Sequence, residues 1–253
     1  MEGIFQRSGV KIPKQSMWDM LVRVDELVSK PILAQMHTEL LEEPILHSDE
    51  TSVSLCIEGQ KNSQTSWVWG WRSVAGAGPA KVLIQFLESR SREGPRSFLG
   101  EWKGILITDG YAAYESVCRE NRIVRAGCWS HARRKFKEAF DTGSREAAPV
   151  LALIGRLFAV ERAIKERAER QGLEHAQRLE LRSSVRARTS KRLLARIYAE
   201  IAELGSRPST LPKSKLGKAV GYATNQRDAL SVFVERSGVP IHNNDQELSL
   251  IHI

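Results

Sequence analysis

Apolar residues change their spacing along the chain, and the first stretch has helical spacing. Between residues 15 and 43 they recur every three to four positions, which is the period of an amphipathic helix. These positions are Trp18, Leu21, Val22, Leu27 and Val28, followed after Pro31 by Leu33, Met36, Leu40 and Leu41. The pattern therefore predicts an amino-terminal helical segment over residues 1–43.

Three short apolar segments follow in quick succession, and their residue types favour strands. They span residues 45–56, 66–74 and 81–87, and Gly78-Pro79 marks a turn between the last two. The second segment alternates Trp67, Trp69 and Trp71. This period of two favours burial against one face of a sheet over stacking on nucleic-acid bases. The short links between the segments predict an antiparallel meander.

The pattern then alternates between helix and strand. We expect a short helix at 95–102, a strand at 104–108 that ends at Asp109-Gly110, a helix at 111–121 and a strand at 122–128. A further helix begins at Trp129. A meander followed by this alternation indicates an α/β domain with a mixed sheet, which we assign to residues 44–144.

From residue 145 to residue 205 the strand patterns disappear. Two apolar stripes at helical spacing lie there, and a third lies in a single long helix predicted over residues 214–234. The stripes consist of Leu151, Ile154, Leu157, Phe158 and Val160, of Leu193, Leu194, Ile197, Ile201 and Leu204, and of Leu216, Val220, Ala223, Leu230 and Phe233. We therefore predict an all-helical insertion at 145–205 and a return to the core at 206–247.

Charge is concentrated in the predicted insertion. The 253 residues include 38 Lys and Arg against 30 Asp and Glu, a formal net charge of 38 − 30 = +8. Residues 161–200 contain 11 basic and 6 acidic residues, so this block carries 11 − 6 = +5. The block is either a surface for DNA phosphates or a pair of solvated helical faces, and the sequence leaves both interpretations open. The candidates for phosphate contact are Arg182, Arg186, Arg188, Lys191 and Arg192.

Composition narrows the class of protein. Hydrophobic residues make up 42% and charged residues 27%, which argues against global disorder. No stretch approaches the ~18 uninterrupted apolar residues of a membrane-spanning helix, and no secretory signal is visible. Cys56, Cys118 and Cys128 are odd in number and widely spaced, which argues against a disulfide scaffold. We therefore expect a cytoplasmic protein without a membrane partner.

Two carboxylates lie where a sheet enzyme carries its ligands. Asp49 lies in the first predicted strand and Asp109 ends a later one, and ligands bind at the carboxyl ends of strands in open α/β sheets. Two such carboxylates on neighbouring strands can share hard divalent cations. Taken singly, Asp-Gly after a strand is more often a simple turn. A basic cluster after the last strand is a further candidate for phosphate contact, or else the start of a basic amphipathic helix: His131, Arg133, Arg134 and Lys135.

Four motifs occur in order along the chain. They read HSDET at His47–Thr51, LITDGYAAY at Leu106–Tyr114, GCWSHARRKF at Gly127–Phe136 and VPIHNNDQE at Val239–Glu247. With these motifs the chain resembles the insertion sequence 66 family of DDE transposases, from about residue 15 to residue 247.

The resemblance implies a site, a fold and an activity. The catalytic and metal-binding acids are then Asp49, Asp109 and Glu247, with Mg²⁺ as cofactor and Mn²⁺ as the alternative. The implied fold is RNase H-like, with the helical insertion between the last strand and a final catalytic helix. The implied activity is metal-dependent strand cleavage and strand transfer at the ends of a mobile element. Its partners are double-stranded DNA at element ends, target DNA and a second copy of the chain on DNA, in the bacterial cytoplasm at the nucleoid.

The sequence departs from the family pattern after Glu247. The family continues with an Arg, a Leu-Arg pair and a long helix, whereas this chain reads Leu248 to Ile253. We therefore expect residues 248–253 to be a non-native tail and the chain to be a truncated, inactive core. Family members also carry amino-terminal DNA-recognition regions, so end-specific binding is not expected. Two alternatives stay open: an inactive DNA-binding remnant, and a metal-dependent nuclease of the same fold.

Overall fold

The computed structural model describes residues 5, 7, 9, 11–56, 63–74, 76 and 78–243. Glu247 and the tail 248–253 lie outside these residues. Contacts divide the chain into two compact units, Met1–Glu42 and Glu43–Ile253. No helix in the described part of the chain is both long enough and apolar enough to cross a membrane.

The first unit is helical, as the apolar spacing predicts. It contains α2 (Lys14–Val24), a π-helical turn at Asp25–Ser29 and α3 (Lys30–Leu41). Pro31 lies just after this π-helical turn inside a continuous helix, and its missing N–H removes one hydrogen bond from the helical ladder there. Trp18, Leu21 and Leu27 are more than half exposed. Leu40 is the one buried residue among the described helical positions 14–41.

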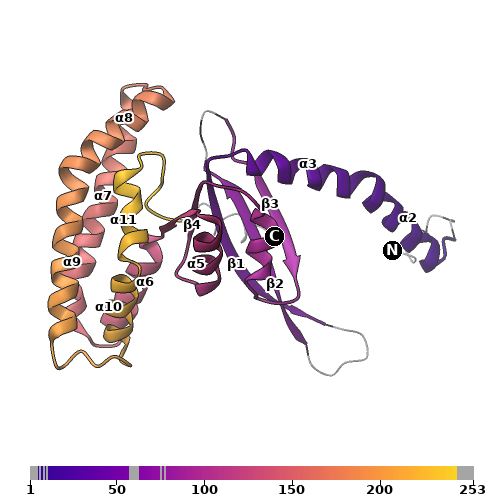
Figure 1. Ribbon diagram of the computed structural model, residues 1–253. Coiled ribbons are helices and arrows are strands. Elements are labelled where there is room, and N and C mark those ends of the chain that lie inside the picture. Colours follow the sequence, from indigo (N-terminus) through magenta and orange to yellow (C-terminus); the bar gives the residue numbers. More distant parts are fainter. Residues whose placement is uncertain are drawn as a thin grey trace. The chain divides into compact units, whose positions relative to one another are not determined.

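The second unit is built on a five-stranded mixed sheet with the order β3-β2-β1-β4-β5 (Figure 1). The strands are β1 (Ile45–Leu55), β2 (Gln64–Ser73), β3 (Val82–Leu87), β4 (Ile105–Thr108) and β5 (Val124–Gly127). β1, β2 and β3 form the antiparallel meander, and β4 and β5 extend it in parallel. The predicted α/β class is therefore confirmed, and the sheet is compatible with an RNase H-like fold.

One face of the sheet is covered by α4 (Glu93–Leu99) and α5 (Ala112–Asn121). Trp69 and Trp71 of β2 are fully buried there. The ring of Phe98 stacks on Trp71 at 3.9 Å, and Tyr114 meets Trp69 edge-on at 5.6 Å. The alternating tryptophans thus bury a sheet face, as their spacing predicts.

The other face carries the main core of the unit. It joins Ile107 of β4 to residues of α6 (Trp129–Asp141) and α11 (Arg227–Glu235). The indole N–H of Trp129 donates to the carbonyl of Leu230 at 2.8 Å. A Cβ at Gly127 of β5 would lie 3.1 Å from Leu230, so glycine allows α11 to approach the strand closely.

The helical insertion packs onto this core. It contains α7 (Ala148–Arg170), α8 (His175–Val185), a π-helical turn at Arg186–Ser190 and α9 (Lys191–Ser206). Figure 1 shows α7 and α9 side by side in one bundle with α6, α10 and α11. Ile154, Leu157 and Ile201 are buried in the same core cluster as Ile107. Insertion and sheet therefore share one hydrophobic core.

The single helix predicted over residues 214–234 is wrong. The segment forms α10 (Lys215–Asn225) and α11, which are separated at Gln226. Gln226 has φ −95° and ψ 9°, outside ideal helical values. It is buried, and its side chain accepts a hydrogen bond from Arg125 at 2.5 Å. A tertiary hydrogen bond at this position is therefore associated with the break.

Candidate active site

Asp49 lies within β1, and Asp109 directly follows β4, the parallel strand next to it. β1 and β4 pair from Ile45 with Ile105 to His47 with Ile107, an offset of 107 − 47 = 60 residues. The offset between the two acids is the same, since 109 − 49 = 60. Extending the register by two residues aligns Asp49 with Asp109, and paired strands lie about 4.8 Å apart. By this alignment both side chains lie on the same face of the sheet, Asp49 within β1 and Asp109 just after the end of β4.

The turn after β4 fixes Asp109. Its Oδ1 accepts a hydrogen bond from the backbone N–H of Tyr111 at 2.8 Å, an Asx-turn that leads into α5. The guanidinium of Arg125 donates to the carbonyl of Asp109 at 3.2 Å. A Cβ at Gly110 would lie 2.6 Å from the ring of Tyr222. Because Gly110 has no Cβ, Tyr222 of α10 can pack against the backbone next to Asp109.

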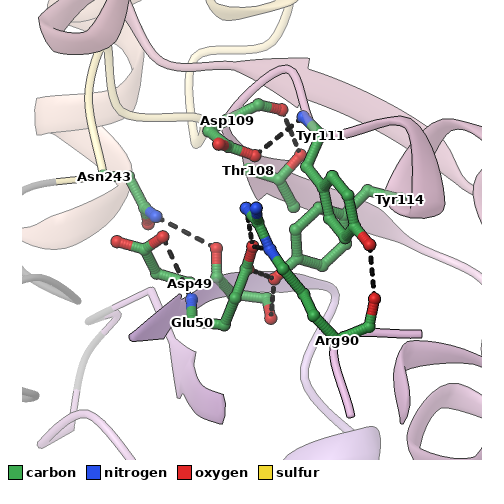
Figure 2. A network of polar contacts seen from close by, with 9 residues as sticks. Asp49, Glu50, Arg90, Thr108, Asp109, Tyr111, Tyr114 and Asn243 are labelled. Atoms are coloured by element: carbon green, nitrogen blue, oxygen red, sulfur yellow. Dashed lines mark hydrogen bonds and ion pairs between the residues drawn. The ribbon is translucent and has the colours of Figure 1, made fainter. Parts of the chain in front are cut away.

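Glu50 points to the opposite face from Asp49, because side chains alternate along a strand. Its carboxylate accepts hydrogen bonds from Tyr114 at 2.7 Å and from Arg90 at 2.8 Å (Figure 2). The Glu50 side chain is 1% exposed. Burial raises the pKa of Glu50, although the hydrogen bonds from Tyr114 and Arg90 oppose the shift. Glu50 therefore stabilises β1 from the face of the sheet opposite to that of Asp49.

Arg90 ties the loop after β3 to the turn after β4. Its guanidinium lies 4.0 Å from the centre of the Tyr111 ring, and the hydroxyl of Tyr111 donates to the Arg90 carbonyl at 2.6 Å (Figure 2). The sequence pattern did not single out Glu50 or Arg90. The period-two rule could have identified Glu50 as the opposite-facing neighbour of Asp49, whereas no local pattern marks Arg90 as its partner.

Tyr222 of α10 borders Asp109 on the other side. Burial, reinforced by the negative charge of Asp109, raises the pKa of Tyr222. The ammonium of Lys135 lies 4.8 Å from the centre of the Tyr222 ring. The basic cluster on α6 therefore reaches the neighbourhood of Asp109 through Lys135.

Asn243 brings the carboxyl-terminal segment to β1. Its side-chain N–H donates to the carbonyl of Ser48 at 3.1 Å, directly before Asp49 in the chain (Figure 2). Its side-chain oxygen lies 2.5 Å from Nδ1 of His47. The described chain ends here, so the predicted role of Glu247 stays a prediction.

Most of the predicted basic residues lie at the surface. Arg133, Arg134, Arg188, Lys191 and Arg192 are exposed, and His131 and Lys135 are partly buried. These residues lie on α6, on the π-helical turn after α8 and in the first turn of α9. Their contact with DNA stays a prediction.

Arg186 is the exception, and the prediction that it contacts phosphate is wrong. The residue is 0% exposed, and its guanidinium forms two hydrogen bonds of 2.7 Å to Glu161. It also donates to the carbonyls of Phe233 and Val239 at 2.5 and 2.9 Å. The side chain of Arg182 beside it is about one-third exposed. The pKa of Arg182 is lowered, mainly by burial and in smaller part by the positive charge of Arg186. A charge count along the sequence cannot separate these structural arginines from surface ones.

The two aligned carboxylates are suitable ligands for a hard cation. Mg²⁺ prefers oxygen ligands and binds through one or two protein carboxylates plus substrate oxygens. No group of three or more His, Cys, Asp or Glu side chains suited to a metal ion occurs among the described residues. Asp49 and Asp109 would supply two donors, and the third predicted donor, Glu247, lies outside the described chain.

Comparisons with known proteins agree with the resemblance to the insertion sequence 66 family. The family model described as "Transposase IS66 family" matches residues 1–251. Two relatives from Sinorhizobium fredii (strain NBRC 101917 / NGR234) are named only as uncharacterized proteins. The chain is 27% identical to y4jD over 87% of its own length and 43% of that protein, and 26% identical to y4qI over 98% and 46%. The chain thus spans less than half the length of the curated relatives it matches.

Proposed function

The chain belongs to the IS66 family of transposases, and from this premise we propose that it is the catalytic core of a DDE transposase. In this proposal Asp49, Asp109 and Glu247 are the catalytic acids for cleavage and joining of DNA strands at the ends of a mobile element. The observation that carries the proposal is the parallel pairing of β1 with β4 as far as His47 and Ile107, since Asp49 and Asp109 each follow two residues later.

The assignment of Glu247 is supported by the length of the chain. Asn243 is anchored at Ser48, beside Asp49, and Glu247 follows four residues later. Four residues span at most about 14 Å when fully extended. This short connection supports the assignment despite the sequence separation of 247 − 109 = 138 residues between Glu247 and Asp109.

Mg²⁺, or Mn²⁺ in its place, fits the donor set. Asp49 and Asp109 would hold the metal, with Glu247 as the third ligand. When bound, two such ions activate the attacking oxygen and stabilise the leaving oxygen in a displacement at phosphorus. The chain's own residues would orient the first two carboxylates, through the Asx-turn at Asp109 and through the hydrogen bond from the backbone N–H of Glu50 to Oδ1 of Asp49 at 3.1 Å.

The exposed basic residues are the proposed DNA surface. Arg and Lys side chains orient a duplex through its phosphates without reading its sequence. Lys135, next to Tyr222 and Asp109, is the best placed to contact the scissile strand. Arg186 takes no part, because its donors are occupied inside the protein. We propose a homodimer on DNA in the bacterial cytoplasm, at the nucleoid, as the working form.

Incubation of the purified chain with Mg²⁺ and DNA carrying the inverted repeats that flank its gene tests the proposal. The proposal predicts nicked and joined products that are lost in Asp49→Asn and Asp109→Asn but not in Asp141→Asn, an exposed acid on α6. Such products would overturn the expectation, drawn from the sequence after Glu247, that this chain is inactive. Products without joined strands would indicate a nuclease instead. Duplex binding without any product would indicate an inactive DNA-binding remnant.

A further inference from the structure

Asn243 links three segments that lie far apart in the sequence. It is fully buried. Its side chain contacts His47 and Ser48 of β1, and its backbone N–H donates to Sγ of Cys128 at 3.2 Å. The backbone N–H of Trp129 in turn donates to the carbonyl of Ile241 at 3.0 Å. The segment 241–243 is therefore fastened both to β1 and to the junction between β5 and α6.

The orientation of the Asn243 amide follows from its partners. A backbone carbonyl only accepts, so the group facing Ser48 is the amide N–H₂ and the group facing His47 is the amide oxygen. The amide oxygen also only accepts, so Nδ1 of His47 carries the proton of that hydrogen bond. One short amide thus satisfies a donor and an acceptor on consecutive residues of β1.

These contacts give Asn243 a role distinct from metal binding. Its amide oxygen and nitrogen are both engaged inside the protein, and the residue has no exposed surface from which to reach a substrate. The carbonyl that it binds belongs to Ser48, the residue directly before Asp49. Any shift of the amide therefore changes the position of the β1 backbone next to Asp49.

We propose that Asn243 is a positioning residue of the metal site. Its amide holds the Ser48 carbonyl and the His47 ring, and so fixes the backbone of β1 directly before Asp49. The proposal rests on the proposed function of the catalytic acids. Residues that orient metal ligands from outside the coordination shell commonly change metal affinity about 10- to 100-fold when they are removed.

Mn²⁺ binding followed by electron paramagnetic resonance tests the proposal without relying on activity. We expect Asn243→Ala to weaken Mn²⁺ binding at least about tenfold. Asn121→Ala is the matched control, because the Asn121 amide also donates to a backbone carbonyl, that of Gly100, at 2.8 Å. This control should bind Mn²⁺ as the wild type does, and Asp49→Asn should lose binding.

A second pair of variants keeps Asn243 in place. His47→Ala removes one hydrogen-bond partner of the Asn243 amide and should weaken Mn²⁺ binding, as Asn243→Ala does. His47→Asn, whose side-chain N–H₂ can replace the Nδ1 donor, should restore it. Nitrogen-15 shifts of the His47 ring should report the Nδ1-protonated tautomer in the wild type and lose that signature in Asn243→Ala. If Asn243→Ala does not fold, the His47 pair decides.

Different results would overturn the positioning role of Asn243 and the proposed function of the acids. Mn²⁺ affinity within about twofold of the wild type in folded Asn243→Ala, or in His47→Ala, would overturn the positioning role and leave the acids in place. A wild-type chain that binds Mn²⁺ no better than Asp49→Asn would contradict the proposed function, and the positioning role would be rejected with it.

Discussion

Replacement of Arg186 by Met should strongly destabilise the second unit. Arg186 ties Glu161 of α7 to the last turn of α11 and to the segment after it, through the carbonyls of Phe233 and Val239. Methionine fills part of the volume but donates no hydrogen bond. Glu161, whose side chain is 14% exposed, would keep a negative charge without its bidentate partner.

The expected loss follows from the burial of this pair. Removing one partner of a buried ion pair costs about 3–5 kcal/mol, because the other charge stays uncompensated. The freed carbonyls add to the cost where water does not reach them. For a domain of this size, 1 kcal/mol corresponds to roughly 2–4 °C in Tm, so Arg186→Met should melt about 6–20 °C below the wild type.

Thermal melts followed by circular dichroism measure this loss. Arg188→Met is the matched control, since Arg188 is exposed on the same π-helical turn and should change stability by no more than about 0.5 kcal/mol. Adding Glu161→Gln to Arg186→Met should recover part of the loss by removing the unpaired charge. Equal melting temperatures for Arg186→Met and Arg188→Met would refute the structural role of Arg186.

Three further outcomes are expected. Three exposed cations, Arg188, Lys191 and Arg192, are proposed to contact DNA phosphates. Neutralising them should reduce the steepness of log K for duplex DNA against log salt by up to about 2.7, and an unchanged slope would show that they do not contact the DNA. Gly110→Ala should cost about 1–3 kcal/mol in chemical denaturation, because its Cβ would lie 2.6 Å from Tyr222, whereas Gly155→Ala on the open face of α7 should cost nothing. Burial raises the pKa of Cys118 to about 12, whereas Cys56 is exposed. A thiol reagent at pH 8 should therefore modify Cys56 and react with Cys118 only after the protein unfolds. Rapid labelling of Cys118 in the native protein would contradict its burial.

The sheet and its first two acids could be predicted from the sequence because both leave local signals. Period-two tryptophans mark a buried face, and an apolar run that ends in Asp-Gly marks the carboxyl end of a strand. The register that aligns Asp49 with Asp109 is a non-local property, but it follows once β1 and β4 are paired.

The remaining features depend on partners far away in the chain. Arg186 is indistinguishable from Arg188 in a charge count, because its partner Glu161 lies 25 residues away on another helix. The break at Gln226 follows a hydrogen bond from Arg125, 101 residues distant. Asn243 gains its position through contacts across 195 and 196 residues. Spacing along the sequence carries no signal for such pairs.

Anomalous diffraction from crystals soaked in Mn²⁺ is the most direct measurement of whether Asp49 and Asp109 form a metal site. An anomalous peak within coordination distance of both carboxylates is predicted, together with its disappearance in crystals of Asp109→Asn. Manganese bound elsewhere on the chain, with neither Asp49 nor Asp109 among its ligands, would contradict the proposed catalytic site.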